Sequence, residues 1–148
     1  MEIERSVEIA RPVGEVFDFV ADARNDVRWC PKVRSVEQIG SEPGEGSRYA
    51  VVHKPVPGRP ERRMEMTCVS FSPPSRLVWR EEDGTDVFEV SYSLSSVRPG
   101  VTRFTQCSAF SLGAPRLLRP LFKAGIGRDV QKQLRLLKEL LEGDDYQR

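Results

Sequence analysis

Apolar and polar residues alternate at the start of the chain, from Ile3 to Ile9, and only Arg5 interrupts the pattern. A period of two residues is typical of a strand that turns one face to the core and the other to water. Pro12 follows, and proline suits the first turn of a helix, where its missing amide hydrogen is not needed. The pattern therefore predicts a half-buried strand and then the start of a helix.

A helical period replaces the alternation after Pro12. Val16, Phe17 and Val20 recur at the spacing of one helix face, and the stretch 22–26 ends the run. A second short helix or turn is predicted around 25–29, because Pro31 bars its continuation.

The middle of the chain predicts an antiparallel meander of strands. Turn signals rich in Gly, Pro, Ser and Asp lie at 41–46, 55–60, 72–75, 83–84 and 98–100. Short connections at these turns predict a set of opposed pairs. The pairs are Met64 with Val51, Met66 with Tyr49, Cys68 with Trp79, Trp79 with Phe88, Leu77 with Val90, Val90 with Ser108, Tyr92 with Gln106 and Leu94 with Phe104.

Opposed residues share a face of a sheet, so the pairs collect most apolar residues on one predicted face. This inner face comprises Tyr49, Val51, His53, Met64, Met66, Cys68, Leu77, Trp79, Phe88, Val90, Tyr92, Leu94, Phe104, Gln106, Ser108 and Phe110. The other face collects polar residues, such as Glu65, Arg80, Ser93 and Arg103. A β-bulge in one strand would invert part of the assignment.

A long helix is predicted from about Pro115 to Glu142. An apolar stripe runs along it, formed by Leu117, Leu118, Leu121, Phe122, Ile126, Val130, Leu134, Leu137 and Leu141. Its basic residues form either a solvated face or a contact for anionic lipid. Gly125 and Gly127 interrupt the stripe and indicate either close packing on the sheet or a soft point that lets the first half move as a lid. One helix across a curved sheet leaves a concave face partly covered, which predicts a pocket.

Composition narrows the class of protein. The 148 residues predict a single domain over 1–148. A net charge of +1, from 23 basic and 22 acidic residues, gives no general attraction for nucleic acid. Three cysteines without a CxxC pair are expected to be small core residues in a reducing compartment. With no apolar signal segment and no run of about 18 apolar residues, we expect a cytoplasmic protein without stable membrane insertion.

Several short motifs follow one another in a fixed order. They are Val16-Phe17-Asp18-Phe19-Val20-Ala21-Asp22, Trp29 with Pro31, Val36-Glu37, Gly44-x-Gly46, Pro73-Pro74-x-Arg76-Leu77-Val78-Trp79, Gly100-x-Thr102-Arg103 and Leu137-Lys138-x-x-Leu141-Glu142. Together they resemble the START-related helix-grip superfamily (SRPBCC), specifically its bacterial polyketide cyclase/dehydrase and lipid-transport branch. The resemblance covers nearly the whole chain.

The resemblance implies an α+β helix-grip fold. A seven-stranded antiparallel sheet would wrap around the long C-terminal helix, with the first strand at an edge and two short helices between strands 1 and 2. A mostly apolar cavity would lie between sheet and helix. The shared motifs look structural, so no catalytic residue follows from them.

Polar groups on the inner face are the candidates for chemistry. Tyr49, Tyr92, Gln106 and Ser108 either bond to one another, to the backbone or to water, or they orient a ligand among apolar walls. His53 is the only histidine. It is either structural or lies at the cavity mouth as a hydrogen-bonding group or general base, and Tyr92 is the second catalytic candidate.

The predicted ligand contacts come from the inner face, the short helices and the last helix. They are Trp29, Tyr49, Val51, His53, Met64, Met66, Cys68, Trp79, Phe88, Val90, Tyr92, Gln106, Ser108, Phe110, Leu118 and Phe122. Trp29 is either a plug between short helices and sheet or a cap on the ligand. Access is predicted between the start of the last helix and the 55–60 loop.

The favoured function is the binding or transport of a small hydrophobic ligand, such as a lipid, a polyketide or another polycyclic compound. One alternative is a polyketide cyclase, aromatase or dehydratase that uses the same cavity. Another is a protein-interaction or co-chaperone module, which a filled core and an exposed apolar patch would favour. We expect no cofactor, no metal and no nucleic-acid partner, and a monomer or a homodimer.

Overall fold

The computed structural model describes residues 1–40, 43–55, 60–110, 115–143 and 146. The strands are β1 (Glu2–Ile9), β2 (Val33–Ile39), β3 (Arg48–His53), β4 (Arg62–Ser72), β5 (Arg76–Glu82), β6 (Val87–Arg98) and β7 (Val101–Phe110). Between β1 and β2 lie α1 (Val13–Ala21), the 3₁₀ turn η1 (Ala23–Asn25) and α2 (Asp26–Trp29). A second 3₁₀ turn, η2 (Arg116–Leu118), leads into α3 (Arg119–Glu142).

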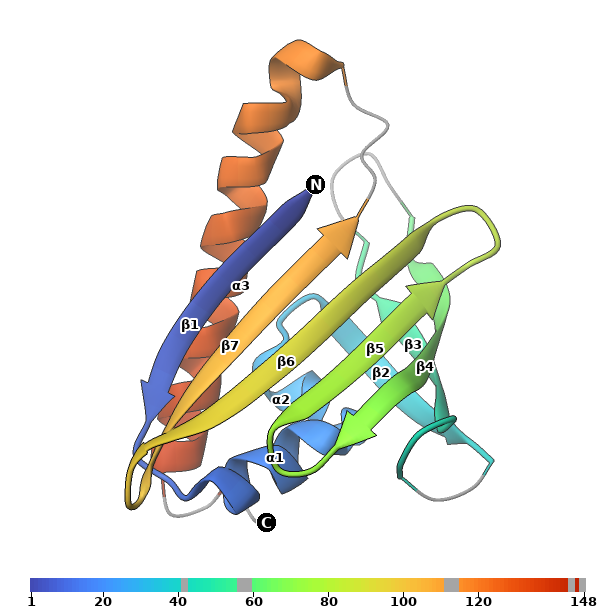
Figure 1. The fold of residues 1–148 in the computed structure, drawn as a ribbon. Coiled ribbons are helices and arrows are strands. Elements are labelled where there is room, and N and C mark those ends of the chain that lie inside the picture. The colour runs from blue at the N-terminus through green and yellow to red at the C-terminus, as the bar shows by residue number, and fades with distance from the viewer. Residues whose placement is uncertain (41–42, 56–59, 111–114, 144–145, 147–148) are drawn as a thin grey trace.

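The strands form one antiparallel sheet in the order β1-β7-β6-β5-β4-β3-β2. The first strand therefore lies at an edge, beside the last. Helix α3 runs along β1 on the inner side of the sheet, and α1 and α2 close one end of the fold (Figure 1). The predicted α+β helix-grip architecture, with seven strands and a long C-terminal helix, is confirmed.

The register of the meander agrees with the predicted pairs at all but one turn. Val51 lies opposite Met64, Cys68 opposite Trp79, and Leu94 opposite Phe104. The turn at 83–84 is the exception, and two predicted pairs there are wrong. Trp79 faces Val90 rather than Phe88, and Leu77 faces Tyr92 rather than Val90.

The longer turn at 83–86 has a physical cause. Asp83 Oδ1 accepts the backbone N–H groups of Thr85 and Asp86, each at 2.9 Å, and so extends a two-residue turn to four residues. Gly84 supplies the positive φ, at 89°. The shift equals two residues, so every side chain of β6 keeps its predicted face.

A β-bulge changes the inner face in the second half of β4. The register shifts between Cys68 and Ser70, so Phe71 pairs with Leu77. Phe71 then turns inward, and its ring lies 5.4 Å from that of Phe17 in α1. The inner face passes from even-numbered to odd-numbered positions at this point, which alternation alone does not predict.

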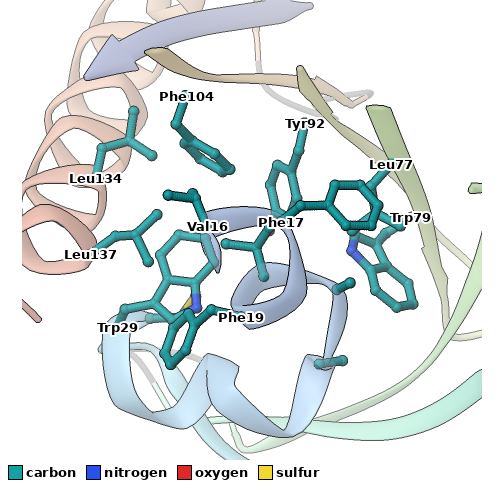
Figure 2. Close-up of a cluster of buried hydrophobic side chains, with 14 of the residues drawn as sticks. Val16, Phe17, Phe19, Trp29, Leu77, Trp79, Tyr92, Phe104, Leu134 and Leu137 are labelled. Atoms are coloured by element: carbon teal, nitrogen blue, oxygen red, sulfur yellow. The ribbon is translucent and has the colours of Figure 1, made fainter. Parts of the chain in front are cut away.

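Side chains fill the end of the fold that α1 and α2 cover. Trp29 of α2 lies edge-on to Phe104 at 6.2 Å between ring centroids, and Tyr92 lies 5.0 Å from Phe104. Leu134 and Leu137 of α3 complete this cluster from the other side (Figure 2). Trp29 is only 1% exposed and packs between the short helices and the sheet, and whether it also contacts a ligand stays a prediction.

The predicted stripe of α3 divides into two surfaces. Val130, Leu134, Leu137 and Leu141 are buried, whereas the apolar residues between Leu117 and Phe122 are exposed. From Leu118 to Leu134 the apolar positions recur every fourth residue. Each such step turns the stripe about 40° around the helix, because four residues exceed one turn of 3.6. Four steps rotate it by about 160°, so its first part points away from the sheet.

The two glycines of α3 have different surroundings. A Cβ atom at Gly127 would lie 2.4 Å from Nη2 of Arg5, whereas nothing lies within 4 Å of the corresponding position at Gly125. Arg5, the residue that interrupts the alternation of β1, thus uses the space left at Gly127. The guanidinium is the far end of a flexible side chain and can shift, so close packing at Gly127 and a lid motion both stay predictions.

Candidate ligand pocket

The strand ends opposite α1 and α2 form one wall of a pocket. Because adjacent strands are antiparallel, the end of β5 lies beside the starts of β4 and β6. Glu81 faces Met66 on one side and Phe88 on the other. Phe88 in turn faces Phe110 at the end of β7. The register thus brings side chains from distant parts of the sequence onto one patch of the inner face.

This pocket has a volume of about 390 Å³, which lies in the range of sites for small organic ligands. The sheet contributes most of the lining, and Ile126 of α3 closes it from the helix side. The lining residues are Lys32, His53, Lys54, Pro60, Arg62, Met64, Glu81, Phe88, Glu89, Val90, Ser108, Ala109, Phe110 and Ile126.

Charged residues surround an apolar floor. Lys32 pairs with Asp129 of α3 at 2.6 Å and so links the α2–β2 connection to the helix across the pocket. Arg62 pairs with Asp83 at 2.6 Å and with Asp86 at 2.5 Å. Its guanidinium carbon also lies 5.4 Å above the ring of Phe88. These contacts fix the charged side chains at the edge of the pocket, and aromatic and aliphatic side chains form its floor.

His53 and Glu81 form the polar pair inside the pocket. The His53 Nε2 atom lies 3.3 Å from Glu81 Oε1, and the side chains are 26% and 16% exposed. A carboxylate beside an imidazole fixes the orientation of the ring. The pair is therefore placed to exchange a proton, or a hydrogen bond, with a ligand in the pocket.

A buried carboxyl group lies close to this pair. Asp26, the first residue of α2, is 9% exposed. Burial, together with the negative charges of Glu81 and Asp22, raises the pKa of Asp26 well above its ordinary value. Burial and the charge of Asp26 likewise raise the pKa of Tyr92. Both groups therefore favour their neutral, proton-donating forms.

The polar residues of the inner face partly satisfy one another. The Nε2 atom of Gln106 donates to Ser108 Oγ at 3.2 Å. The Oε1 atom of Gln106 and the indole Nε1 of Trp29 are buried and have no hydrogen-bond partner among the residues that the structure describes. Buried polar atoms without partners are rare, and they mark positions where a ligand atom or a water molecule would be stabilised.

The structure divides the predicted ligand contacts among four places. Six line the pocket, namely His53, Met64, Phe88, Val90, Ser108 and Phe110. The core holds Trp29, Tyr49, Val51, Met66, Cys68, Trp79 and Tyr92. Gln106 is buried beside Ser108, and Leu118 and Phe122 are exposed on α3. Which of them touches a ligand stays a prediction.

Several pocket and neighbouring residues were not among the sequence candidates. Glu81 follows Leu77 and Trp79 at a spacing of two residues. Extending this alternation by one step would have placed Glu81 on the predicted inner face. Arg62 precedes Met64 and Met66 in the same way, although its place near a loop favours a solvated residue. The sequence does not indicate a pocket role for Asp26, because a short helix after a turn is too short to show a periodic pattern.

The predicted access route lies partly outside the described residues. Lys54 and Pro60, on the two sides of positions 56–59, line the pocket, as does Ile126 of α3. Within the part of the chain that the structure describes, no helix combines the length and apolarity needed to cross a bilayer. No cluster of three or more metal-ligating side chains occurs among the same residues.

Solved structures with this fold come from several bacteria. A protein from Thermus thermophilus has 20% identity and a TM-score of 0.77, over 94% of this chain and 95% of that one. A START superfamily protein from Mycobacterium smegmatis has 15% identity and a TM-score of 0.77, over 95% and 97%. The Zhui aromatase/cyclase from Streptomyces sp. R1128 has 15% identity and a TM-score of 0.76, over 96% and 93%. At these identities the likeness concerns the fold.

The sequence itself identifies the family. No curated protein matches it. The family model described as polyketide cyclase / dehydrase and lipid transport matches residues 1–142, which is almost the entire chain. The match covers every strand and helix described above, including the strand ends and the helix that form the pocket. The chain therefore belongs to the polyketide cyclase/dehydrase and lipid transport family.

Proposed function

We propose that this protein binds a small hydrophobic ligand in the pocket between the strand ends and α3, and carries it. The observation that supports the proposal is the composition of the pocket wall. Met64, Phe88, Val90 and Phe110 provide apolar surface, and His53 and Glu81 provide a localised polar pair. Affinity would come from burial of apolar area, and the polar pair would orient one end of the ligand.

Filling the pocket should weaken ligand binding strongly without unfolding the protein. Val90 is half-buried in the pocket wall, so Val90→Trp would place an indole in the ligand volume. We expect the affinity for anilinonaphthalene sulfonate, measured by fluorescence titration, to fall about tenfold or more, which corresponds to roughly 1.4 kcal/mol. Ser93→Trp is the matched control, because Ser93 is exposed on the outer face of the same strand.

Both variants should keep the far-ultraviolet circular dichroism of the parent protein. Equal affinity in the parent and in a folded Val90→Trp variant would contradict the proposed site. Native mass spectrometry of protein purified from its own host tests the carrier role itself. A co-purifying, chemically unmodified hydrophobic compound would support it.

The His53–Glu81 pair favours a second candidate, a polyketide cyclase or aromatase. Some neighbours in fold are aromatase/cyclases, such as the Streptomyces protein. A reactive chain held in the pocket would lie beside a general acid–base pair, so proximity and proton transfer would act together. The observation is specific to this pocket, because both side chains belong to its lining.

Turnover separates the enzyme from the carrier. If the protein is an enzyme, it should convert a poly-β-ketone surrogate, and His53→Ala should lower the rate about a hundredfold, a usual effect of losing a general acid or base. The same variant should retain dye binding, because the apolar floor is unchanged. No turnover by the parent protein, with a bound unmodified ligand, would favour the carrier.

A further inference from the structure

The 3₁₀ turn η2 and the first turn of α3 carry an exposed apolar surface. Leu117, Leu118, Leu121 and Phe122, which we call the α3 tip, are 93%, 44%, 66% and 45% exposed. Figure 1 shows this end of α3 extending beyond the ends of β1 and β7. Neighbouring large apolar side chains exposed on a folded domain indicate contact with a membrane or another protein.

Basic residues accompany this apolar surface. Arg116, Arg119, Lys123 and Arg128 are all exposed, and no acidic residue occurs between Pro115 and Arg128. The chain as a whole has a net charge of only +1, so this positive segment is a local feature. A partner for the α3 tip must therefore offer negative charge together with apolar surface.

Most of the basic residues lie on a different side of the helix from the apolar ones. When η2 is counted with α3 at about 100° per residue, the apolar residues of the α3 tip fall within an arc of about 140°. Arg116, Arg119 and Lys123 fall outside this arc, whereas Arg128, further along the helix, falls within it. This separation is typical of helices that lie in a membrane interface, with apolar side chains in the acyl region and basic ones among the headgroups.

We propose that the α3 tip docks onto the surface of an anionic lipid bilayer. A second copy of this chain fits the surface less well, because a twofold contact would bring the same basic residues together. An anionic bilayer offers negatively charged headgroups and an apolar acyl region beneath them. Docking at its surface requires no membrane-spanning helix.

The position of the pocket favours a bilayer over an acidic protein. Ile126 lines the pocket and lies one turn beyond Phe122 on the same helix. A hydrophobic ligand could then pass between the bilayer and the pocket with little exposure to water. Passage of a ligand between bilayer and pocket rests on the proposed carrier function. Docking itself does not, because it is inferred from the apolar residues of the α3 tip and the basic residues beside them.

Vesicle flotation tests the docking surface directly. The full chain should float with vesicles of phosphatidylglycerol and phosphatidylcholine, and not with phosphatidylcholine alone. Lys123→Gln should lower the partition coefficient about fivefold, the usual contribution of one basic residue near an anionic surface. Leu121→Glu with Phe122→Glu should lower it more than tenfold, because two apolar contacts become charged. Added salt should weaken binding of the parent protein.

Matched variants elsewhere in the chain provide the controls. Val97→Glu replaces a 39% exposed apolar residue near the β6–β7 turn, and Arg135→Gln removes an exposed charge from the second half of α3. Both should bind anionic vesicles like the parent protein. No flotation at low salt would overturn the docking proposal. Equal losses of vesicle binding in the control variants and in the α3 tip variants would also overturn it. A protein that binds no vesicles but forms a dimer, which Phe122→Glu dissociates, would overturn it as well.

Measuring dye binding in the absence of vesicles distinguishes the carrier proposal from the docking proposal. A protein that binds anionic vesicles but no hydrophobic dye would contradict the carrier function and leave the docking surface supported. A protein that binds dye in the pocket but no vesicles would contradict docking alone. The variants of the α3 tip lie outside the pocket lining, so their dye affinity should equal that of the parent protein.

Discussion

Replacing Leu134 by alanine should lower the free energy of unfolding by about 2–5 kcal/mol, the usual cost of a large cavity in a buried core. Leu134 is 0% exposed and lies with Leu137 in the cluster that joins α3 to the sheet. The same substitution at Leu121, which is 66% exposed, should change stability by no more than about 0.5 kcal/mol. Urea denaturation followed by circular dichroism measures both values.

The comparison tests the division of α3 into two surfaces. Leu121 and Leu134 belong to one helix and one apparent stripe, and both lose the same side-chain atoms. A large loss at Leu121 would show that the first turns of α3 pack against something that the monomer lacks, and a second copy would then become the better occupant of the α3 tip. The slope of the urea transition should be the same in both variants, because neither changes the surface exposed on unfolding.

Alternation within short hairpins made the sheet predictable. Once Val51 faces Met64 and Cys68 faces Trp79, the inner face follows from a period of two, and a turn error of two residues does not disturb it. The long terminal helix was predictable for the same reason, because its apolar spacing is regular over many turns.

The rest depended on features that periodicity does not encode. The bulge at Cys68–Ser70 turns Phe71 inward, and the slow rotation of the stripe turns Leu118 and Phe122 outward. The pocket lies at the end of the fold that Trp29 and Phe104 do not fill, and Met64, Phe88 and Phe110 line it. Packing of this kind is a property of three-dimensional volumes and is not visible in a pattern of apolar residues.

Asp26→Asn should stabilise the protein at alkaline pH by more than about 1 kcal/mol, because the neutral amide avoids the cost of ionising a carboxyl group inside the fold. The cause is the environment of the carboxylate, since burial and the charges of Glu81 and Asp22 raise the pKa of Asp26 in the folded state. Asp18→Asn is the control, because Asp18 is exposed in α1 and its replacement should have little effect.

The pH dependence follows from the direction of this shift. A folded-state pKa above the unfolded value means that the native protein holds its proton more tightly, so ionisation of Asp26 destabilises the fold. Below about pH 4, the usual pKa of an unfolded aspartate, the parent and Asp26→Asn proteins should differ little. Stability of the parent should then fall relative to the variant as pH rises toward the raised pKa of Asp26, and the difference should level off above it.

Glu81→Gln connects this titration with the pocket. Removing the charge of Glu81 removes one cause of the raised pKa of Asp26, so the advantage of Asp26→Asn at pH 8 should be smaller in the Glu81→Gln background. Urea denaturation of the four proteins of this double-mutant cycle, at pH 4 and pH 8, measures the coupling. A coupling of zero at pH 8 would contradict the charge of Glu81 as a cause of the raised pKa of Asp26.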